Sequence, residues 1–221
     1  MTLPAQMVDR WHNRAEPGPG EGTVYWHMLM RNHPQVANLA AQAQQRLAPY
    51  AAGLHMTPRE WLHMTTLIAG PAASFTDDQL RQMTSEAAKL LADIPPVTVT
   101  LGRILYHPEA IMLGVTPAAA LLPIRDAACK ATQLVTGNQE PGADAPPWIP
   151  HITICYSTSE QPARPLIDAL GLHLPSRDIQ ISALSLVIQR GPERRWDWTI
   201  VSTIYLDDHA RGPSLIRTEI L

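Results

Sequence analysis

The sequence predicts an α+β protein built as two halves of similar plan. Segments with strand patterns alternate with segments with helix patterns along most of the 221 residues. A strand pattern that contains the triplet His-x-Thr occurs once in each half, at His63–Thr65 and at His151–Thr153. The 45% content of hydrophobic residues is ordinary for a globular chain with a packed core.

Composition and charge limit the class of function. The net charge of -3 and the pI near 6.3 argue against a broad basic surface, so we expect no extended DNA partner. No run approaches the roughly 20 apolar residues of a membrane span, and the N-terminus lacks the apolar core of a signal peptide. We therefore expect a cytoplasmic protein that does not bind a membrane. Cys129 and Cys155 lie in apolar contexts and are expected to be buried free thiols.

The first half begins after a Pro/Gly-rich lead over residues 1–22, which we expect to be flexible. Strand patterns then cover residues 23–30 and 62–69, and helix patterns cover residues 35–50 and 76–92. Thr76 and Gln79 have the spacing of a capping box, which fixes the start of the second helix.

The second half repeats this theme. Strand patterns are expected at residues 97–105, 110–115, 148–156, 179–189 and 196–206, and helix patterns at residues 121–135 and 164–170. A polar Gly/Pro loop over residues 137–147 leads into the second triplet. The elements predict one domain over residues 23–206, followed by a polar tail over residues 207–221.

The two triplets place reactive side chains on one face of a strand. Side chains alternate along a strand, so the His and the Thr of each triplet share a face about 7 Å apart. Imidazole titrates near neutral pH, and two imidazoles can take a proton from a nucleophile and give a proton to a leaving oxygen. A Thr hydroxyl can donate a hydrogen bond to the charge that develops on phosphate oxygens. The pair of triplets therefore predicts a site that cleaves a phosphodiester.

At these residues the chain resembles the two-histidine (2H) phosphoesterase superfamily. The similarity is to the bacterial 2'-5' RNA ligase-like (LigT-like) branch, which includes RNA 2',3'-cyclic phosphodiesterases. The signature of this family is two copies of H-h-[TS]-h, where h is apolar, and the copies here are His63–Thr66 and His151–Ile154. Only Thr66, at the last apolar position, departs from it. The resemblance covers residues 23–206 and implies two pseudo-symmetric antiparallel-sheet lobes with outer helices around a central groove.

The resemblance also implies the activity and the residues that perform it. His63, Thr65, His151 and Thr153 would be the catalytic residues, converging on one phosphate. They would hydrolyse the 2',3'-cyclic phosphate end of an RNA or a nucleotide to a 2'-phosphate, with no metal and no cofactor. Which histidine is the acid depends on how the substrate is oriented.

Two alternatives stay open at this point, and we expect a monomer in each case. The same site could act, as a phosphodiesterase or a ligase, on 2'-5'-linked or cyclic oligonucleotides or on a small nucleotide metabolite. Alternatively, the protein could be a non-catalytic module that binds nucleotides.

Three further residues are candidates for substrate binding. Tyr156 follows the second triplet and could stack on a base, although packing in the core explains it as well. Arg103 lies in an apolar strand pattern and could steer phosphate into the groove, or could lie on an edge strand in water. His27 shares a strand face with Tyr25 and could point into the groove, or be a packed sheet histidine.

A third triplet, His55–Thr57, has a different interpretation. Pro58 and Glu60 follow it, so Thr57 is expected to be the N-cap of a helix rather than part of a catalytic strand. We expect His55→Ala to spare activity. No metal-ligand spacing accompanies any of the triplets, and we expect no metal site.

Overall fold

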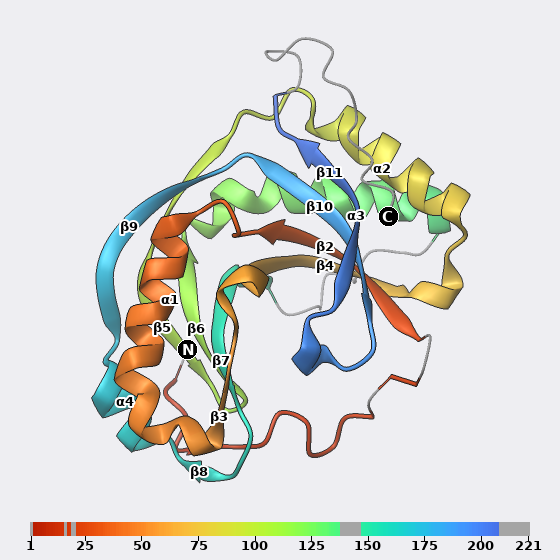
Figure 1. The fold of residues 1–221 in the computed structure, drawn as a ribbon. Coiled ribbons are helices and arrows are strands. Elements are labelled where there is room, and N and C mark those ends of the chain that lie inside the picture. The colour runs from red at the N-terminus through yellow and green to blue at the C-terminus, as the bar shows by residue number, and fades with distance from the viewer. Residues whose placement is uncertain (1, 16, 19–20, 138–146, 208–221) are drawn as a thin grey trace.

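The computed structural model describes residues 2–15, 17–18, 21–137 and 147–207, and these form two curved sheets with helices outside (Figure 1). One sheet has four antiparallel strands in the order β11-β10-β2-β4, and the other has five in the order β3-β7-β6-β5-β9. Helices α2 and α3 pack on the four-stranded sheet, α1 packs on the five-stranded sheet, and α4 packs against α1. The predicted α+β fold with two antiparallel-sheet lobes is therefore confirmed.

The bounds of the elements are as follows. The strands are β1 (Gln6–Met7), β2 (Gly22–Leu29), β3 (Leu54–Met56), β4 (His63–Pro71), β5 (Val97–His107), β6 (Ala110–Thr116), β7 (His151–Ser157), β8 (Gln161–Pro162), β9 (His173–Ile181), β10 (Ala183–Arg190) and β11 (Trp198–Tyr205). The α-helices are α1 (Pro34–Leu47), α2 (Asp77–Leu91), α3 (Leu122–Thr136) and α4 (Ala163–Leu170). Short 3-10 helices occupy Ala48–Gly53, Arg59–Trp61, Ala72–Ser74, Ala118–Leu121 and Glu193–Arg195. No helix in these described segments has the length and apolar character required to cross a bilayer.

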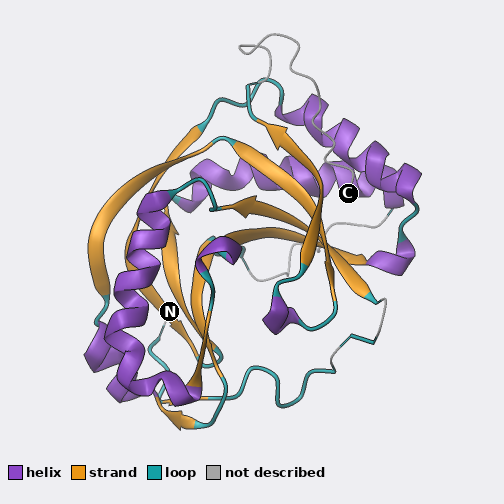
Figure 2. Cartoon of the chain, viewed as in Figure 1, coloured by secondary structure: helices purple, strands orange, loops and turns teal. Residues whose placement is uncertain are grey.

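The two lobes are not the two halves of the sequence. The four-stranded lobe takes β2 and β4 from the first half and β10 and β11 from the end of the chain, as Figure 2 allows the reader to follow. Between β2 and β4 the chain crosses to the other lobe to form α1 and β3. Each sheet therefore buries apolar side chains from distant parts of the sequence, and neither lobe is a contiguous segment.

Most predicted elements are present with small shifts at their ends. The capping box of α2 is formed, since the Thr76 hydroxyl accepts a hydrogen bond from the Gln79 backbone N–H and the Gln79 side chain accepts one from the Thr76 N–H. The prediction of a single long strand over residues 179–189 is wrong. Ser182 separates β9 from β10, and the two strands belong to different sheets, so the chain passes from one lobe to the other there.

The third triplet also differs from its prediction. Residues Leu54–Met56 form strand β3, which pairs with β7, and Thr57 is not a helix cap. Pro58 precedes the 3-10 helix, and the buried Thr57 hydroxyl has no hydrogen-bond partner within the described segments. The pairing with β7 satisfies the backbone of this segment, so the strand forms in place of the expected cap.

The start of the chain packs against the five-stranded lobe, although the sequence predicted a flexible lead there. Strand β1 pairs with β8, and the Met7 side chain is fully buried in the core. The backbone N–H of Arg10 donates to the Ser157 carbonyl. Of the predicted tail over residues 207–221, all but Asp207 lies outside the described residues, as does most of the predicted loop over residues 137–147.

Candidate active site

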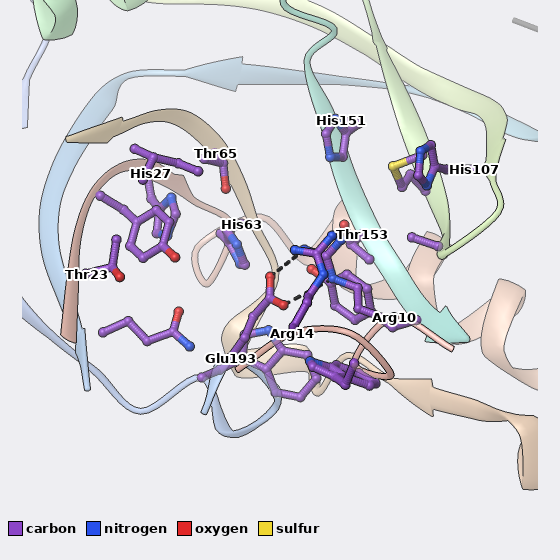
Figure 3. Close-up of a pocket in the computed structure, with 18 of the residues that line it drawn as sticks. Arg10, Arg14, Thr23, His27, His63, Thr65, His107, His151, Thr153 and Glu193 are labelled. Atoms are coloured by element: carbon purple, nitrogen blue, oxygen red, sulfur yellow. Dashed lines mark hydrogen bonds and ion pairs between the residues drawn. The ribbon is translucent and has the colours of Figure 1, made fainter. Parts of the chain in front are cut away.

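A pocket of about 840 Å³ lies between the two sheets and is lined by all four residues of the His-x-Thr motifs. His63 and Thr65 reach it from β4, and His151 and Thr153 reach it from β7, as Figure 3 shows. Within each motif the intervening residue, Met64 or Ile152, is completely buried in the core. The alternation of side chains along each strand therefore turns both His and Thr toward the pocket.

The two motif strands are held together directly. Strand β4 is the edge strand of the four-stranded sheet and lies against β7 of the other sheet. The indole N–H of Trp148, three residues before His151, donates a hydrogen bond of 3.1 Å to the Thr65 carbonyl. This bond ties the segment that carries one motif to the strand that carries the other.

The two catalytic candidates make the same hydrogen bond to their own chain. His63 Nδ1 lies 2.7 Å from the Trp61 carbonyl oxygen, and His151 Nδ1 lies 2.7 Å from the Ile149 carbonyl oxygen. A carbonyl can only accept, so Nδ1 carries the proton and donates it in both rings. Each neutral ring then has an unprotonated Nε2, which can accept a proton in the pocket.

His63 lies in an apolar, crowded environment. Its ring centroid is 4.3 Å from that of His27 and 4.8 Å from that of Trp198. Burial lowers the pKa of His63 to about 4; the hydrogen bond to Trp61 opposes this shift, nearby His151 adds to it, and the Glu193 carboxylate opposes it. His63 is therefore neutral at pH 7.

His151 lies in a more polar part of the same pocket. Burial lowers its pKa, the hydrogen bond to Ile149 opposes the shift, and the charges of His107 and Arg10 lower it further. Both candidate imidazoles are therefore weaker bases than a free imidazole. An anionic ligand between them would raise both pKa values, because a nearby negative charge favours the imidazolium form.

The two threonines differ in how firmly they are held. Thr153 is 9% exposed and close to Tyr156: burial raises the pKa of Tyr156 to about 12, and a hydrogen bond with Thr153 opposes part of this increase. Thr65 is half-buried and its hydroxyl has no such neighbour within the described segments. Both hydroxyls face the pocket and can donate to a bound anion.

The predicted substrate-binding residues have different outcomes. Tyr156 lines the pocket, but its ring is only 7% exposed and the Arg10 guanidinium lies 4.9 Å above its centroid. Arg103 does not line the pocket. A register irregularity at Gly102 interrupts the pairing of β5, and Arg103 is exposed opposite His173 of the neighbouring strand.

His27 lines the pocket from β2 and is 1% exposed. Its ring stacks on that of Tyr25 at a centroid distance of 5.0 Å. Trp26, the residue between them in the strand, points into the core. His27 Nδ1 has no hydrogen-bond partner within the described segments. Burial lowers the pKa of His27 well below its usual value, and His63 lowers it further, so this ring stays neutral.

Several pocket residues lie outside the motifs and were not identified from the sequence. Arg10 and Arg14 come from the N-terminal segment, and Glu193 comes from the turn between β10 and β11. No sequence pattern links these positions to the motifs, because only the folded chain brings the N-terminus and this turn together. Among the described residues no group of three or more His, Cys, Asp or Glu side chains could hold a metal ion.

Comparison with known proteins assigns the family. A family profile described as the 2'-5' RNA ligase superfamily matches residues 33–193, which is well over half of the chain and includes both His-x-Thr motifs. The chain belongs to the 2'-5' RNA ligase superfamily. The resemblance to the LigT-like branch of the 2H phosphoesterases is thereby confirmed. No curated protein sequence matches the chain.

Solved structures with the same fold support this assignment. TT0787 of Thermus thermophilus superposes with a TM-score of 0.62 at 17% identity, over 84% of this chain and 98% of that one. Escherichia coli LigT in its apo form gives a TM-score of 0.59 at 15% identity, over 84% and 98% of the two chains. The ns2 PDE domain of MHV gives a TM-score of 0.56 at 11% identity, over 76% and 99%. These similarities establish the fold of a 2'-5' RNA ligase superfamily member.

In this superfamily member, the sheet that carries His63 extends beyond the residues that the family profile matches. Strand β2 precedes residue 33 and strand β11 follows residue 193, yet both belong to the sheet that carries His63. The N-terminal segment with Arg10 also lies before the match. The pocket is therefore built from the family core together with segments on either side of it.

Proposed function

We propose that this protein is a phosphodiesterase that opens 2',3'-cyclic phosphate ends of RNA or nucleotides and leaves a 2'-phosphate. In this reaction water attacks phosphorus, a new P–O bond forms, and the bond from phosphorus to the ribose 3' oxygen breaks. One of His63 and His151 takes the proton from water, and the other gives its proton to the departing oxygen. No metal is required for either transfer.

The observation that carries the proposal is the matched hydrogen bond of the two imidazoles. Each ring is fixed through Nδ1 to the carbonyl two residues before it, at 2.7 Å in both cases. Fixed rings with Nε2 available in one pocket can act as a base and an acid in the same turnover. After one turnover the ring that acted as base is protonated and the ring that acted as acid is not. Proton exchange with solvent then restores the original protonation of both rings.

The threonines supply the second requirement of the reaction. Negative charge builds on the non-bridging oxygens as water attacks, and hydrogen-bond donors that are already in place stabilise it. The hydroxyls of Thr65 and Thr153 reach the pocket from the same strand faces as the two histidines. Each side of the phosphate would thus meet one imidazole and one hydroxyl.

Related structures support a nucleotide as the substrate. Escherichia coli LigT, which shares this fold, has been solved in complex with ATP, with 3'-AMP and with NADP+. Another structure of the same fold is described as a phosphoesterase. A nucleotide phosphodiester fits both the family and the acid–base chemistry of the pocket.

The proposal is tested with purified protein and a nucleoside 2',3'-cyclic phosphate in buffer that contains EDTA. We expect the nucleoside 2'-phosphate as the product, and a loss of kcat/KM by a factor of about 10² to 10⁴ in each of His63→Ala and His151→Ala. His173→Ala, which removes an exposed histidine outside the pocket, is the matched control and should retain activity. Activity that depends on added metal, or that survives in either pocket variant, would contradict the proposal.

The family description favours one second candidate, action on 2'-5' linkages. The same two imidazoles would then cleave a 2'-5'-linked oligonucleotide, or join two RNA ends in the reverse direction. A panel of cyclic nucleotides, 2'-5'-linked oligonucleotides and small nucleotide diesters separates the candidates by the ratio of their kcat/KM values. Tight binding of a 2'-phosphonucleotide without turnover of any member of the panel would indicate a binding module.

A further inference from the structure

An ion pair between Arg10 and Glu193 forms part of the pocket wall. Arg10 Nη2 lies 2.7 Å from one Glu193 carboxylate oxygen, and Arg10 Nε lies 3.1 Å from the other. Both residues line the pocket, and their side chains are only 18% and 32% exposed. Two parallel hydrogen bonds fix the relative orientation of the guanidinium and the carboxylate.

Arg10 also joins the two lobes. Its Nη1 lies 2.7 Å from a carboxylate oxygen of Glu109, in the turn between β5 and β6 of the five-stranded lobe. Glu193 belongs to the turn between β10 and β11 of the four-stranded lobe. The guanidinium is therefore held from both sides, and the backbone N–H of Arg10 is fixed by Ser157.

The pair lies close to the reacting positions. In Figure 3 the contact between Arg10 and Glu193 is drawn beside His63 and Thr153. Glu193 acts on the pKa of His63, and Arg10 acts on that of His151, so each charged group is within electrostatic reach of one imidazole. A phosphate bound between the imidazoles would experience both the positive and the negative member of the pair.

The charges around the pocket nearly cancel. Among its lining residues, the guanidinium groups of Arg10 and Arg14 are opposed by the Glu193 carboxylate. Glu109, just outside the lining, binds both guanidinium groups, at 2.7 Å and 2.8 Å. The other titratable lining side chains are Tyr25, His27, His63, His107, His151 and Tyr156. Because His27 and His63 are neutral, they add no positive charge that would attract an anion.

Arg10 nevertheless keeps the capacity to bind one. A guanidinium has five N–H groups, and the three hydrogen bonds to Glu193 and Glu109 use three of them. The two that remain can donate to phosphate oxygens, while the neighbouring carboxylate limits how much negative charge is tolerated.

We propose that the Arg10–Glu193 pair makes the pocket selective for monoanionic phosphodiesters over dianionic phosphomonoesters. This rests on the proposed function, in which the substrate is a diester and the product is a monoester. Arg10 would bind the single charge of the diester, and Glu193 would repel the second charge that appears when the ring opens. The pair therefore selects the substrate and favours release of the product.

The effect of Glu193→Gln follows from the charge of the ligand. Glutamine keeps the size of the side chain and one of the two acceptor oxygens that bind Arg10, and it removes the charge. Coulomb energy scales with ligand charge, so the gain in binding free energy is twice as large for a dianion as for a monoanion. If the affinity for a monoanion rises by about threefold, that for a dianion should rise by about tenfold.

The test uses two ligands that differ by one methyl group and one unit of charge. They are 3'-deoxyadenosine 2'-phosphate and its methyl ester, which are a dianion and a monoanion at pH 8 and lack the 3' hydroxyl that could attack phosphorus. Calorimetry at low salt gives the dissociation constant of each ligand for the wild type, Glu193→Gln and Glu109→Gln. Glu109→Gln is the matched control, because it also removes a carboxylate from Arg10 but not one that lines the pocket.

We expect the wild type to bind the methyl ester at least as tightly as the monoester. Glu193→Gln should shift this preference toward the monoester by about threefold. Glu109→Gln should change the preference less. Equal shifts for the two ligands, or a wild type that already prefers the dianion, would overturn the proposal. The wild-type measurement decides the matter even if Glu193→Gln does not fold. Because binding needs no turnover, a failure of selectivity and a failure to hydrolyse cyclic phosphates are seen separately.

Discussion

The two His-x-Thr strands have the same local geometry in different surroundings. In β4 and in β7 the histidine bonds to the carbonyl two residues before it, at the same distance of 2.7 Å. The residue between His and Thr is buried in both strands. This local geometry follows from the short motif itself, because strand alternation and a backbone acceptor are all that it requires.

The surroundings come from the rest of the fold. His63 packs against the neutral ring of His27 and the indole of Trp198, whereas His151 is near His107 and the charged Arg10. Both rings have lowered pKa values, yet the causes differ beyond the burial that they share. The motif therefore orients each imidazole, and the lobe around it determines how readily that imidazole is protonated.

Removing the threonine hydroxyl of either motif should have the largest effect on kcat among the tests of the two strands. We expect Thr65→Val and Thr153→Val each to lower kcat on a 2',3'-cyclic nucleotide by about 10²-fold, since a donor to the developing charge is lost. We expect the two losses to differ in size, because Thr153 forms a hydrogen bond with Tyr156 whereas Thr65 has no such partner among the residues that the structure describes. Steady-state kinetics on both variants measures the difference.

Equal losses in kcat would indicate that the two strands contribute symmetrically to the transition state. Changes confined to KM would mean that the hydroxyls bind the substrate and the transition state equally, which contradicts their proposed role.

The pH dependence of kcat/KM tests the environments of the two histidines. The reaction needs one imidazolium and one neutral imidazole, and this population is largest between the two pKa values. Burial lowers both pKa values below the usual 6.5, that of His63 to about 4. Above the higher of the two, the acid loses its proton as pH rises. We therefore expect kcat/KM to fall by about tenfold between pH 7 and pH 8.

A pH series of kcat/KM on a cyclic nucleotide checks this expectation, because this parameter reports the free enzyme. The diester phosphate stays monoanionic across the range and adds no titration of its own. An optimum at or above pH 8 would show that the imidazole environments of the free enzyme are not those of the structure.

Much of this site could be predicted from the sequence because its signals are local. The alternation along residues 23–30 placed Tyr25 and His27 on one face and Trp26 on the other, and the structure has this arrangement. The capping box of α2 and the two motifs are likewise patterns of a few neighbouring residues. Such patterns fix the direction of a side chain without knowledge of the whole fold.

The parts that could not be predicted depend on contacts between distant segments. Arg10 meets Glu193 only because the N-terminal segment and the turn between β10 and β11 lie together in the folded chain. The apolar run over residues 179–189 has the pattern of one strand. The structure shows that the strand ends before Ser182, because the residues on either side belong to different sheets. Arg103 illustrates the same limit, since the sequence left open a position in the groove or on an edge strand. In the structure it is exposed on β5, which lies between β6 and β9.

The smallest expected effect is a change in stability at Thr66, where the first motif departs from the family pattern. Thr66 of β4 corresponds to Ile154 of β7, and both side chains are buried. The Thr66 hydroxyl has no hydrogen-bond partner within the described segments, and a buried polar group without a partner is destabilising. Thr66→Val, which keeps the shape, should raise the free energy of unfolding by about 1 kcal/mol and leave kcat/KM unchanged.

Urea denaturation measures this gain as a higher midpoint at an unchanged slope. Thr132→Val is the matched control, because that buried hydroxyl donates to the Ala128 carbonyl and accepts from the Trp26 indole. Its removal strands the indole N–H and should destabilise the fold by about 1 to 3 kcal/mol. If Thr66→Val also destabilised the protein, its hydroxyl would have a partner in solution, and the first motif would carry a polar contact that the second motif does not need.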